Sequence, residues 1–87
     1  MSVREKIYNE IITEREYQDN KWGTAFDDKN TANDWVAYLV CYLGKAVTLP
    51  WDRAIFRQMV LKVAALCFAT LETLERNDGL PPRHYDN

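Results

Sequence analysis

Two segments without a polar face constrain this chain more than any other feature. Residues 35–43 read WVAYLVCYL, nine consecutive apolar or aromatic residues, and Lys62 is the only charged residue from Met59 to Ala69. A helix that is apolar around its whole circumference belongs inside a larger assembly, because any face left in water would expose apolar surface. Both segments therefore predict helices that are covered on several sides.

The spacing of apolar residues predicts three helices and no strand. A loop is expected over residues 23–32, where Gly, Asp, Asn and Thr are frequent. The fold class is all-α, with one domain over residues 1–79 and an extended tail over residues 80–87. The predicted helices cover about residues 2–20, 32–48 and 51–77.

The ends of these helices carry recognisable signals. Gly23 is expected to end the first helix, and Thr31-x-x-Asp34 approximates a capping box at the start of the second. Pro50 cannot continue the second helix but suits the first turn of the third. Asn77-Asp78-Gly79 offers a left-handed cap that ends the third helix.

The apolar segments also predict self-association. Each helix of a three-helix bundle keeps an outward face, so three helices cannot cover two all-apolar members. We expect a homodimer or a dimer of dimers, in which residues 32–48 and 51–77 of each chain form a shared four-helix core. Cys41 and Cys67 lie in these segments and are expected to be buried, reduced thiols.

Charge and hydropathy narrow the range of partners. The net charge is −2 and there is no basic stripe, so nucleic acid is not expected as a partner. The start MSVREKIYNE lacks the apolar core of a signal peptide, and the longest apolar run is shorter than the roughly 18 residues that span a bilayer. A cytoplasmic protein without a membrane partner is expected.

Residues at two places are candidates for binding a small anion. Gln18, Lys21 and Trp22 stand at the end of the first helix, where an aromatic ring can stack on a flat ligand and a lysine can meet a phosphate. Arg83 in the tail could bind a phosphate with two hydrogen bonds. The alternatives are a solvated helix end with a packed Trp, and a mobile terminus.

Acidic residues suggest a different chemistry. Glu72-x-x-Glu75 places two carboxylates on one face of the third helix, and Mg²⁺ needs converging carboxylates. If the second and third helices form a hairpin, this pair lies beside the loop over residues 23–32. Most such pairs are simply solvated.

The order of these motifs resembles the small MazG-like proteins of phages and mobile gene cassettes. They belong to the all-α nucleoside triphosphate pyrophosphohydrolases, and the resemblance covers about residues 10–75. It implies a dimer with a shared helical bundle and Mg²⁺-dependent release of pyrophosphate. The matching residues are Glu14, Arg15, Gln18, Lys21, Trp22 and Gly23, then Leu43, Gly44 and Ala46, then Lys62-Val-Ala-Ala65.

The chain departs from that family where the metal ligands belong. The family writes Glu-Glu-x-Gly-Glu-Ala on its second helix, whereas residues 41–46 read CYLGKA. Met59 and Lys62 occupy the region of the third helix where the family has acids. Lys45 and Lys62 would repel a Mg²⁺ ion, so no metal site is expected.

The sequence therefore favours a non-catalytic, dimeric relative that binds a nucleotide-like or other small anionic ligand, with Lys45 and Lys62 in place of the metal charge. One alternative is an active Mg²⁺-dependent pyrophosphohydrolase with a relocated acidic site. Another is a protein–protein adaptor that binds no small molecule. The residues of the relocated site would be Glu14, Asp34, Glu72 and Glu75.

Overall fold

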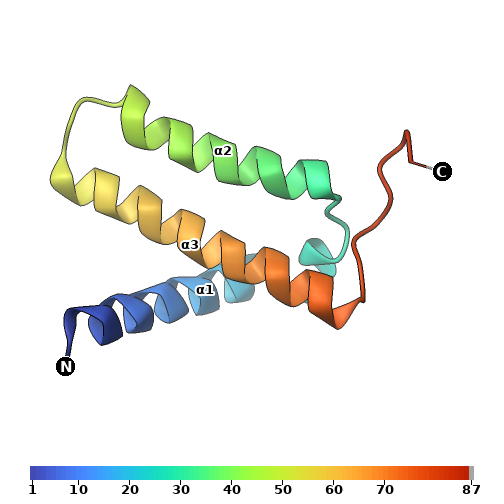
Figure 1. Ribbon diagram of the computed structural model, residues 1–87, viewed down its shortest axis with the longest axis horizontal. Coiled ribbons are helices and arrows are strands. Elements are labelled where there is room, and N and C mark those ends of the chain that lie inside the picture. Colours follow the sequence, from blue (N-terminus) through green and yellow to red (C-terminus); the bar gives the residue numbers. More distant parts are fainter. Residues whose placement is uncertain (87) are drawn as a thin grey trace.

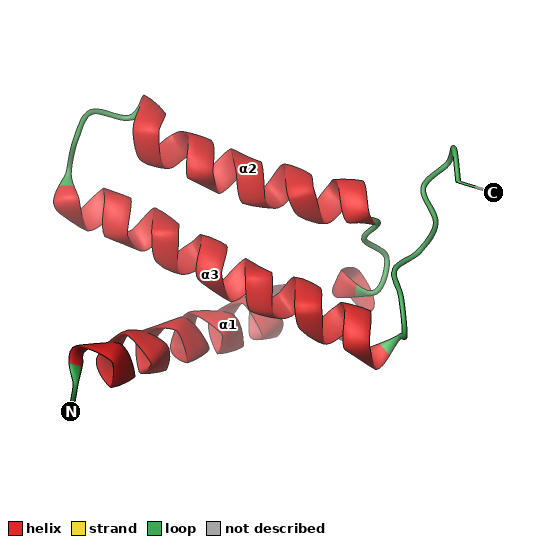
Figure 2. Cartoon of the chain, in the orientation of Figure 1, coloured by secondary structure: helices red, strands yellow, loops and turns green. Residues whose placement is uncertain are grey.

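The computed structural model describes residues 1–86 and confirms the all-α class (Figure 2). Within that range the chain forms three helices joined by short loops. The second helix agrees with its predicted bounds, and the third begins and ends slightly inside them. The helices are α1 (Val3–Asp27), α2 (Ala32–Thr48) and α3 (Arg53–Arg76).

α3 is the central helix of the structure (Figure 1). α2 and α3 form a hairpin, and α1 packs against another side of α3, while the backbones of α1 and α2 do not approach each other. The radius of gyration is 14.3 Å, compared with about 12 Å for a compact chain of this length. The single chain is therefore open and extended.

Side-chain caps fix where α2 and α3 begin. The capping box is confirmed, because the backbone N–H of Asp34 donates to Thr31 Oγ1 and the backbone N–H of Thr31 donates to Asp34 Oδ2. The prediction that Pro50 enters the first turn of α3 is wrong. Asp52 caps that helix instead, since its carboxylate accepts from the backbone N–H of Ile55 at 3.0 Å.

The end of α3 carries the predicted left-handed cap. Asp78 has φ 50° and Gly79 has φ 141°, and the N–H of Gly79 donates to the carbonyl of Leu74 at 2.9 Å. Leu80 then returns to the protein core. Beyond it the tail is not fully extended, because a turn closes at Asp86; residue 87 of the predicted tail lies outside the described residues.

Gly23 breaks α1 without ending it. Its φ of 81° and ψ of 170° interrupt the helix, but residues 24–27 form one further turn, so the loop is shorter than predicted. In a straight helix Arg15 and Asp27 would be about 18 Å apart along the axis. Arg15 Nη2 instead lies 3.3 Å from Asp27 Oδ2. The break at Gly23 therefore folds the last turn back toward the body of α1.

Gly23→Ala is expected to destabilise the protein by about 1–3 kcal/mol, because this backbone conformation is restricted almost entirely to glycine. A Cβ at Gly23 would meet no atom within 4 Å, so the loss reflects backbone strain alone. Gly44 in α2 is the matched control: its Cβ would also meet nothing, and Ala there should stabilise the helix by roughly 0.5–1 kcal/mol. Urea denaturation of both variants measures the difference, and equal effects would contradict the strain argument.

The buried core of the single chain is small. Among residues 1–86 only four hydrophobic residues are buried, and three of them, Trp35, Leu66 and Ala69, form one cluster between α2 and α3. Four partly buried side chains pack against this cluster: Tyr38, Leu39, Tyr42 and Leu80. This cluster joins α2 to α3 and anchors the start of the tail.

Much apolar surface stays exposed. Cys41 and Cys67 are both exposed, so the expectation that they are buried is wrong for the single chain. The accessible surface is 6322 Å², about 1,000 Å² above the roughly 5,300 Å² of a compact monomer of this mass.

α3 is also the one helix, among the described residues, that is long and apolar enough by length and composition to cross a membrane.

Candidate ligand-binding groove

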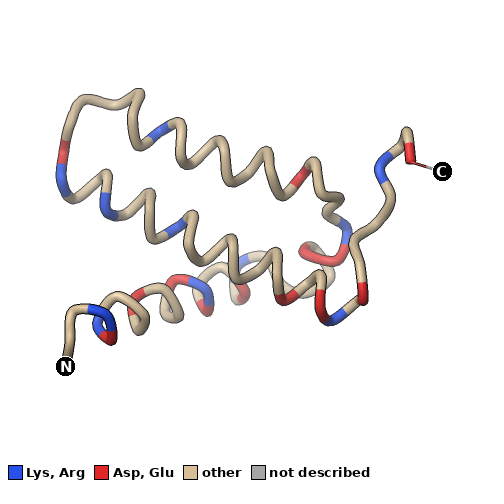
Figure 3. Tube along the Cα trace, in the orientation of Figure 1, with Lys and Arg blue, Asp and Glu red and all other residues tan. Residues whose placement is uncertain are grey.

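Side chains from all three helices converge over the middle of α3, in the space between α1 and α2. The charges in the first half of α3 are all Arg or Lys, whereas its last turns carry Glu72 and Glu75 together with Arg76 (Figure 3). The groove between α1 and α2 meets α3 near Lys62 and Leu66. This region has an aromatic pocket and a cationic centre, and a separate open hollow lies between α1 and α3.

The aromatic pocket has a volume of about 190 Å³. The ring of Trp22 stacks on Phe26 with centroids 6.2 Å apart, and Tyr38 stands edge-on to Trp35 at 6.3 Å. Flat ligands bind well between such rings. The residues that line this aromatic pocket are Trp22, Phe26, Asp27, Asn30, Trp35, Tyr38, Tyr42 and Leu66.

Two donors of the aromatic pocket lack a partner among residues 1–86. Trp35 is 2% exposed and Asn30 is 5% exposed, yet Trp35 Nε1 and Asn30 Nδ2 make no hydrogen bond. Asn30 Oδ1 is occupied by the hydroxyl of Tyr38 at 3.4 Å. A buried donor left unpaired costs about 1–3 kcal/mol. Both nitrogen atoms are closed off from solvent, so the two unpaired donors lower the stability of the fold.

The cationic centre is a cluster of three lysines around two tyrosines, and we call it the lysine–tyrosine cluster. Lys45 Nζ lies 5.1 Å from the ring centre of Tyr42, and Lys62 Nζ lies 6.0 Å from the same ring. Lys21 and Lys62 both lie 5.9 Å from the ring centre of Tyr17. Tyr42 also lines the aromatic pocket, so the two parts of the groove are contiguous.

Only one of the three lysines is paired with an acid in the described part of the chain. Lys62 Nζ lies 3.0 Å from Glu14 Oε1. Gln18, which is buried, donates to the carbonyl of Lys62 at 3.4 Å and so fixes α1 against α3. Lys21 and Lys45 therefore carry the positive charge that is free for an anion.

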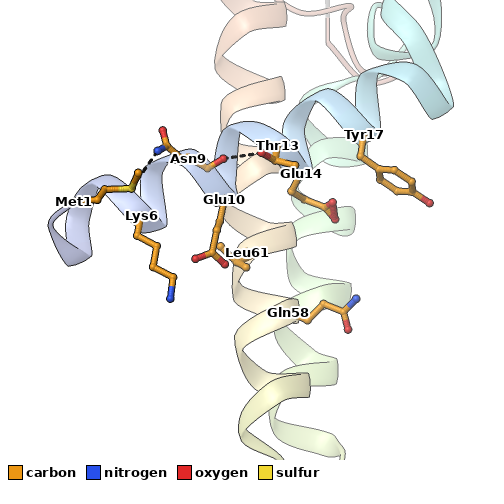
Figure 4. A pocket seen from close by; sticks show the side chains of 9 residues that line it. All are labelled: Met1, Lys6, Asn9, Glu10, Thr13, Glu14, Tyr17, Gln58 and Leu61. Carbon is orange, nitrogen blue, oxygen red and sulfur yellow. Dashed lines mark hydrogen bonds between the residues drawn. The ribbon is translucent and has the colours of Figure 1, made fainter.

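The open hollow has about 640 Å³, lies between α1 and α3 and has a mostly apolar lining (Figure 4). Glu10 and Glu14 project into it from α1, and Gln58 and Leu61 border it from α3. Arg57 Nη2 donates to Glu10 Oε1 at 2.8 Å, and this pair holds the pKa of Glu10 below its usual value. Lys6 also lines the hollow, and both glutamates are paired, Glu10 with Arg57 and Glu14 with Lys62.

Arg15 contacts three acidic side chains, one of which, Asp27, lines the aromatic pocket. Its Nε donates to Glu72 Oε1 at 2.7 Å, and its Nη2 contacts Asp27 at 3.3 Å and Asp19 at 3.7 Å. Burial raises the pKa of Asp27, while the charge of Arg15 opposes that shift. Glu72 therefore lies beside the turn that follows Gly23, as the hairpin prediction required.

Contacts connect five of the six predicted ligand-binding residues around Tyr17 and Tyr42, and of these five Trp22 lines the aromatic pocket. Arg83 is the exception: its contacts in the described residues are with Asn33, Tyr85 and Asp86, at the start of α2 and in the tail. The five that converge are Gln18, Lys21, Trp22, Lys45 and Lys62.

The residues of the relocated acidic site are not brought together. Glu14 pairs with Lys62, Asp34 caps α2 and Glu72 pairs with Arg15. Glu75 is exposed on α3. Residues 1–86 contain no group of three or more His, Cys, Asp or Glu side chains that could hold a metal ion.

Sequence reasoning missed the residues that build the aromatic pocket. Trp35, Tyr38 and Tyr42 recur at three- and four-residue steps, which places their rings on one face of α2. That spacing could have identified the three rings as neighbours, but it is equally typical of a helix face that packs into the protein core. The loop residue Asn30 gave no signal, because its burial depends on the turn that Gly23 allows.

Comparisons of the chain with family models, with curated proteins and with solved structures found no match.

Proposed function

We propose that this protein binds a small nucleotide-like anion in the groove between α1 and α2 and does not transform it. The observation that carries the proposal is the adjacency of the aromatic pocket and the lysine–tyrosine cluster, which share Tyr42. A flat ring would enter the pocket. Its phosphate would lie on the lysines.

The size of the aromatic pocket supports this division of the ligand. Pockets for whole drug-sized ligands have about 300–1,000 Å³, whereas this one has about 190 Å³. It suits a single ring system, with the charged part outside.

The charges support binding without metal-assisted hydrolysis. Lysines replace carboxylates at the centre of the groove, and ammonium groups hold phosphate directly, whereas Mg²⁺ requires oxygen ligands. The resemblance to MazG-like proteins adds the nucleoside phosphates as the first ligand class to try. At the matching positions this chain lacks the acids that the reaction of those proteins needs.

The test is thermal denaturation and calorimetry with inorganic pyrophosphate, nucleosides, nucleoside monophosphates and nucleoside triphosphates. A ligand present at one hundred times its Kd stabilises the folded state by about 2.7 kcal/mol, which raises the Tm of a domain of this size by about 10 °C or more. We expect nucleotides to bind more tightly than pyrophosphate or nucleosides alone.

Lys45→Gln and Lys21→Gln are expected to weaken nucleotide binding by about tenfold each, since each removes a charge-assisted contact. Arg4→Gln is the matched control, because Arg4 is an exposed cation of α1 outside the cluster. Lys62 is unsuitable for this test, since its removal would leave Glu14 unpaired. Equal effects of Lys45→Gln and Arg4→Gln would contradict the assigned site.

Two results would replace the proposal with one of its alternatives. Pyrophosphate release from a nucleoside triphosphate with Mg²⁺, lost on Glu72→Gln, would identify a pyrophosphohydrolase. If no nucleotide raises the Tm at millimolar concentration, the adaptor alternative is favoured.

A further inference from the structure

A further hollow lies between the beginnings of α1 and α3 and shares no lining residue with the aromatic pocket. It has about 420 Å³ and a mostly apolar lining. The two helices diverge toward their N-terminal ends, which leaves this space open (Figure 1). We call it the arginine hollow, because Arg53 and Arg57 line it. Its apolar lining includes Ile7 of α1, Trp51 of the α2–α3 loop, and Phe56 and Val60 of α3.

Trp51 is the most exposed large side chain of this lining. It directly precedes Asp52, the residue that caps α3, and its ring packs on Phe56 with centroids 5.4 Å apart. This is the arrangement of a hydrophobic staple, which fixes how the chain enters a helix. The staple covers only part of the two rings, since Trp51 remains 76% exposed and Phe56 38% exposed. Helix capping therefore leaves most of this apolar surface open to solvent.

The arginine hollow carries positive charge. None of the described residues that line it is acidic. Arg57 is paired with Glu10, which lines the open hollow instead. Arg53 makes no ion pair among the described residues, and neither does Arg4, which precedes Ile7 by three residues on the same face of α1. Two guanidinium groups are therefore free to bind a carboxylate from outside the chain.

This hollow stands at a cationic end of an acidic molecule. The net charge of the chain is −2, yet the segment over residues 45–57 contains Lys45, Arg53 and Arg57 and a single acid, Asp52. The carboxylate of Asp52 is used to cap α3. The glutamates of α3 lie toward its other end (Figure 3). An acidic partner is therefore attracted to the end of the molecule that carries the arginine hollow.

We propose that the arginine hollow binds an acidic, amphipathic helix of a partner protein. A large apolar side chain of that helix fills the hollow beside Trp51, and its carboxylates pair with Arg53 and Arg4. Two diverging helices form a groove in which a third helix can lie, and Trp and Arg are enriched among the side chains that dominate binding at protein interfaces. A small molecule fits less well, because ligand sites bury about 70–90% of the ligand surface, whereas this lining stays exposed. The proposal does not depend on the nucleotide-like ligand.

The probe for this surface is a fluorescein-labelled helical peptide of about 16 residues, with Leu and Phe on one face and Glu on the other. A second peptide carries Lys in place of each Glu. Fluorescence anisotropy with the whole chain should show saturable binding of the Glu peptide, and binding about tenfold weaker or less for the Lys peptide. Equal binding of the two peptides, or no saturation by the Glu peptide at about 1 mM protein, would overturn the proposal.

Two variants test the assigned residues. Arg53→Glu is expected to weaken binding of the Glu peptide by about tenfold or more, because it replaces an attractive contact by a repulsive one. Lys29→Glu is the matched control, since it makes the same change in net charge at an exposed position of the α1–α2 loop, and it should leave the Kd nearly unchanged. Trp51→Leu keeps an apolar staple on Phe56 and should also weaken binding by about tenfold. Equal effects of Arg53→Glu and Lys29→Glu would overturn the assigned site.

Two other occupants are distinguished by the same variants. Binding to phosphatidylglycerol vesicles that is lost in Trp51→Leu, without binding of the Glu peptide, would assign the hollow to a lipid surface. A particle larger than the 10.2 kDa chain in sedimentation equilibrium, converted to a monomer by Arg53→Glu, would assign the hollow to a second copy. Either result would overturn the proposal of an acidic partner helix.

Discussion

Trp35→Ala is expected to remove most of the stability of this protein. Trp35 is 2% exposed and is the largest member of a core with only four buried hydrophobic residues. Truncation of a buried Trp costs about 3–5 kcal/mol, compared with a total of about 4–13 kcal/mol for a chain of this length. The Tm should therefore fall by about 12 °C or more, as measured by circular dichroism in the far ultraviolet.

Two further variants separate packing from hydrogen bonding. Trp35→Phe keeps a ring but loses the N–H, which has no partner among the described residues, so we expect a loss of only about 1–2 kcal/mol. Trp22→Ala removes a ring that is 38% exposed and should cost less than Trp35→Ala. A Tm within a few degrees of wild type for Trp35→Ala would show that the cluster between α2 and α3 does not hold the hairpin together.

The limits of α2 and α3 were largely predictable from sequence because their determinants are local, whereas α1 continues to Asp27, beyond the predicted end at residue 20. The capping box at Thr31 and Asp34 was recognised from residue spacing alone, and so was the cap at Gly79. The start of α3 was misplaced because Pro50 suits a first helical turn, whereas the side chain of Asp52 supplies the cap that decides the position. Competing local signals therefore shifted a boundary and left the fold class intact.

The candidate site was less predictable because it depends on contacts between distant residues. The family resemblance associated Lys45 with Lys62 and left Lys21 as a separate candidate, whereas the hairpin and α1 place all three lysines around Tyr17 and Tyr42. Arg83 looked equally suitable by residue type, but the tail places it beside Asp86. Residue type identified possible chemistry, and only the packing of the helices selected among the candidates.

Arg15→Leu is expected to destabilise the protein by about 3 kcal/mol at neutral pH, because it leaves the buried carboxylate of Asp27 without its countercharge. The side chains of Arg15 and Asp27 are 12% and 9% exposed, so solvent screens the pair only weakly. Asp27→Asn in the same background removes the uncompensated charge. The double variant should therefore regain about 2 kcal/mol, and the double-mutant cycle measures the coupling of the pair.

The pH dependence of Arg15→Leu provides an independent check of sign. Burial already raises the pKa of Asp27 above its ordinary value of 3.8, and loss of Arg15 raises it further. Well below pH 3.8 this carboxyl is protonated in both the folded and the unfolded state and does not change the stability. Above pH 3.8 the unfolded state loses the proton first, so the free energy of unfolding falls until the folded state has lost the proton as well. The deficit relative to wild type should thus be largest at pH 7 and shrink toward pH 4. Arg57 lowers the pKa of Glu10 and Arg76 lowers the pKa of Asp28, so both ion pairs contribute less stability as the pH falls. That loss is the same in wild type and in Arg15→Leu, and it cancels when the two proteins are compared. A deficit that is constant with pH and survives Asp27→Asn would mean that Arg15 acts by packing alone.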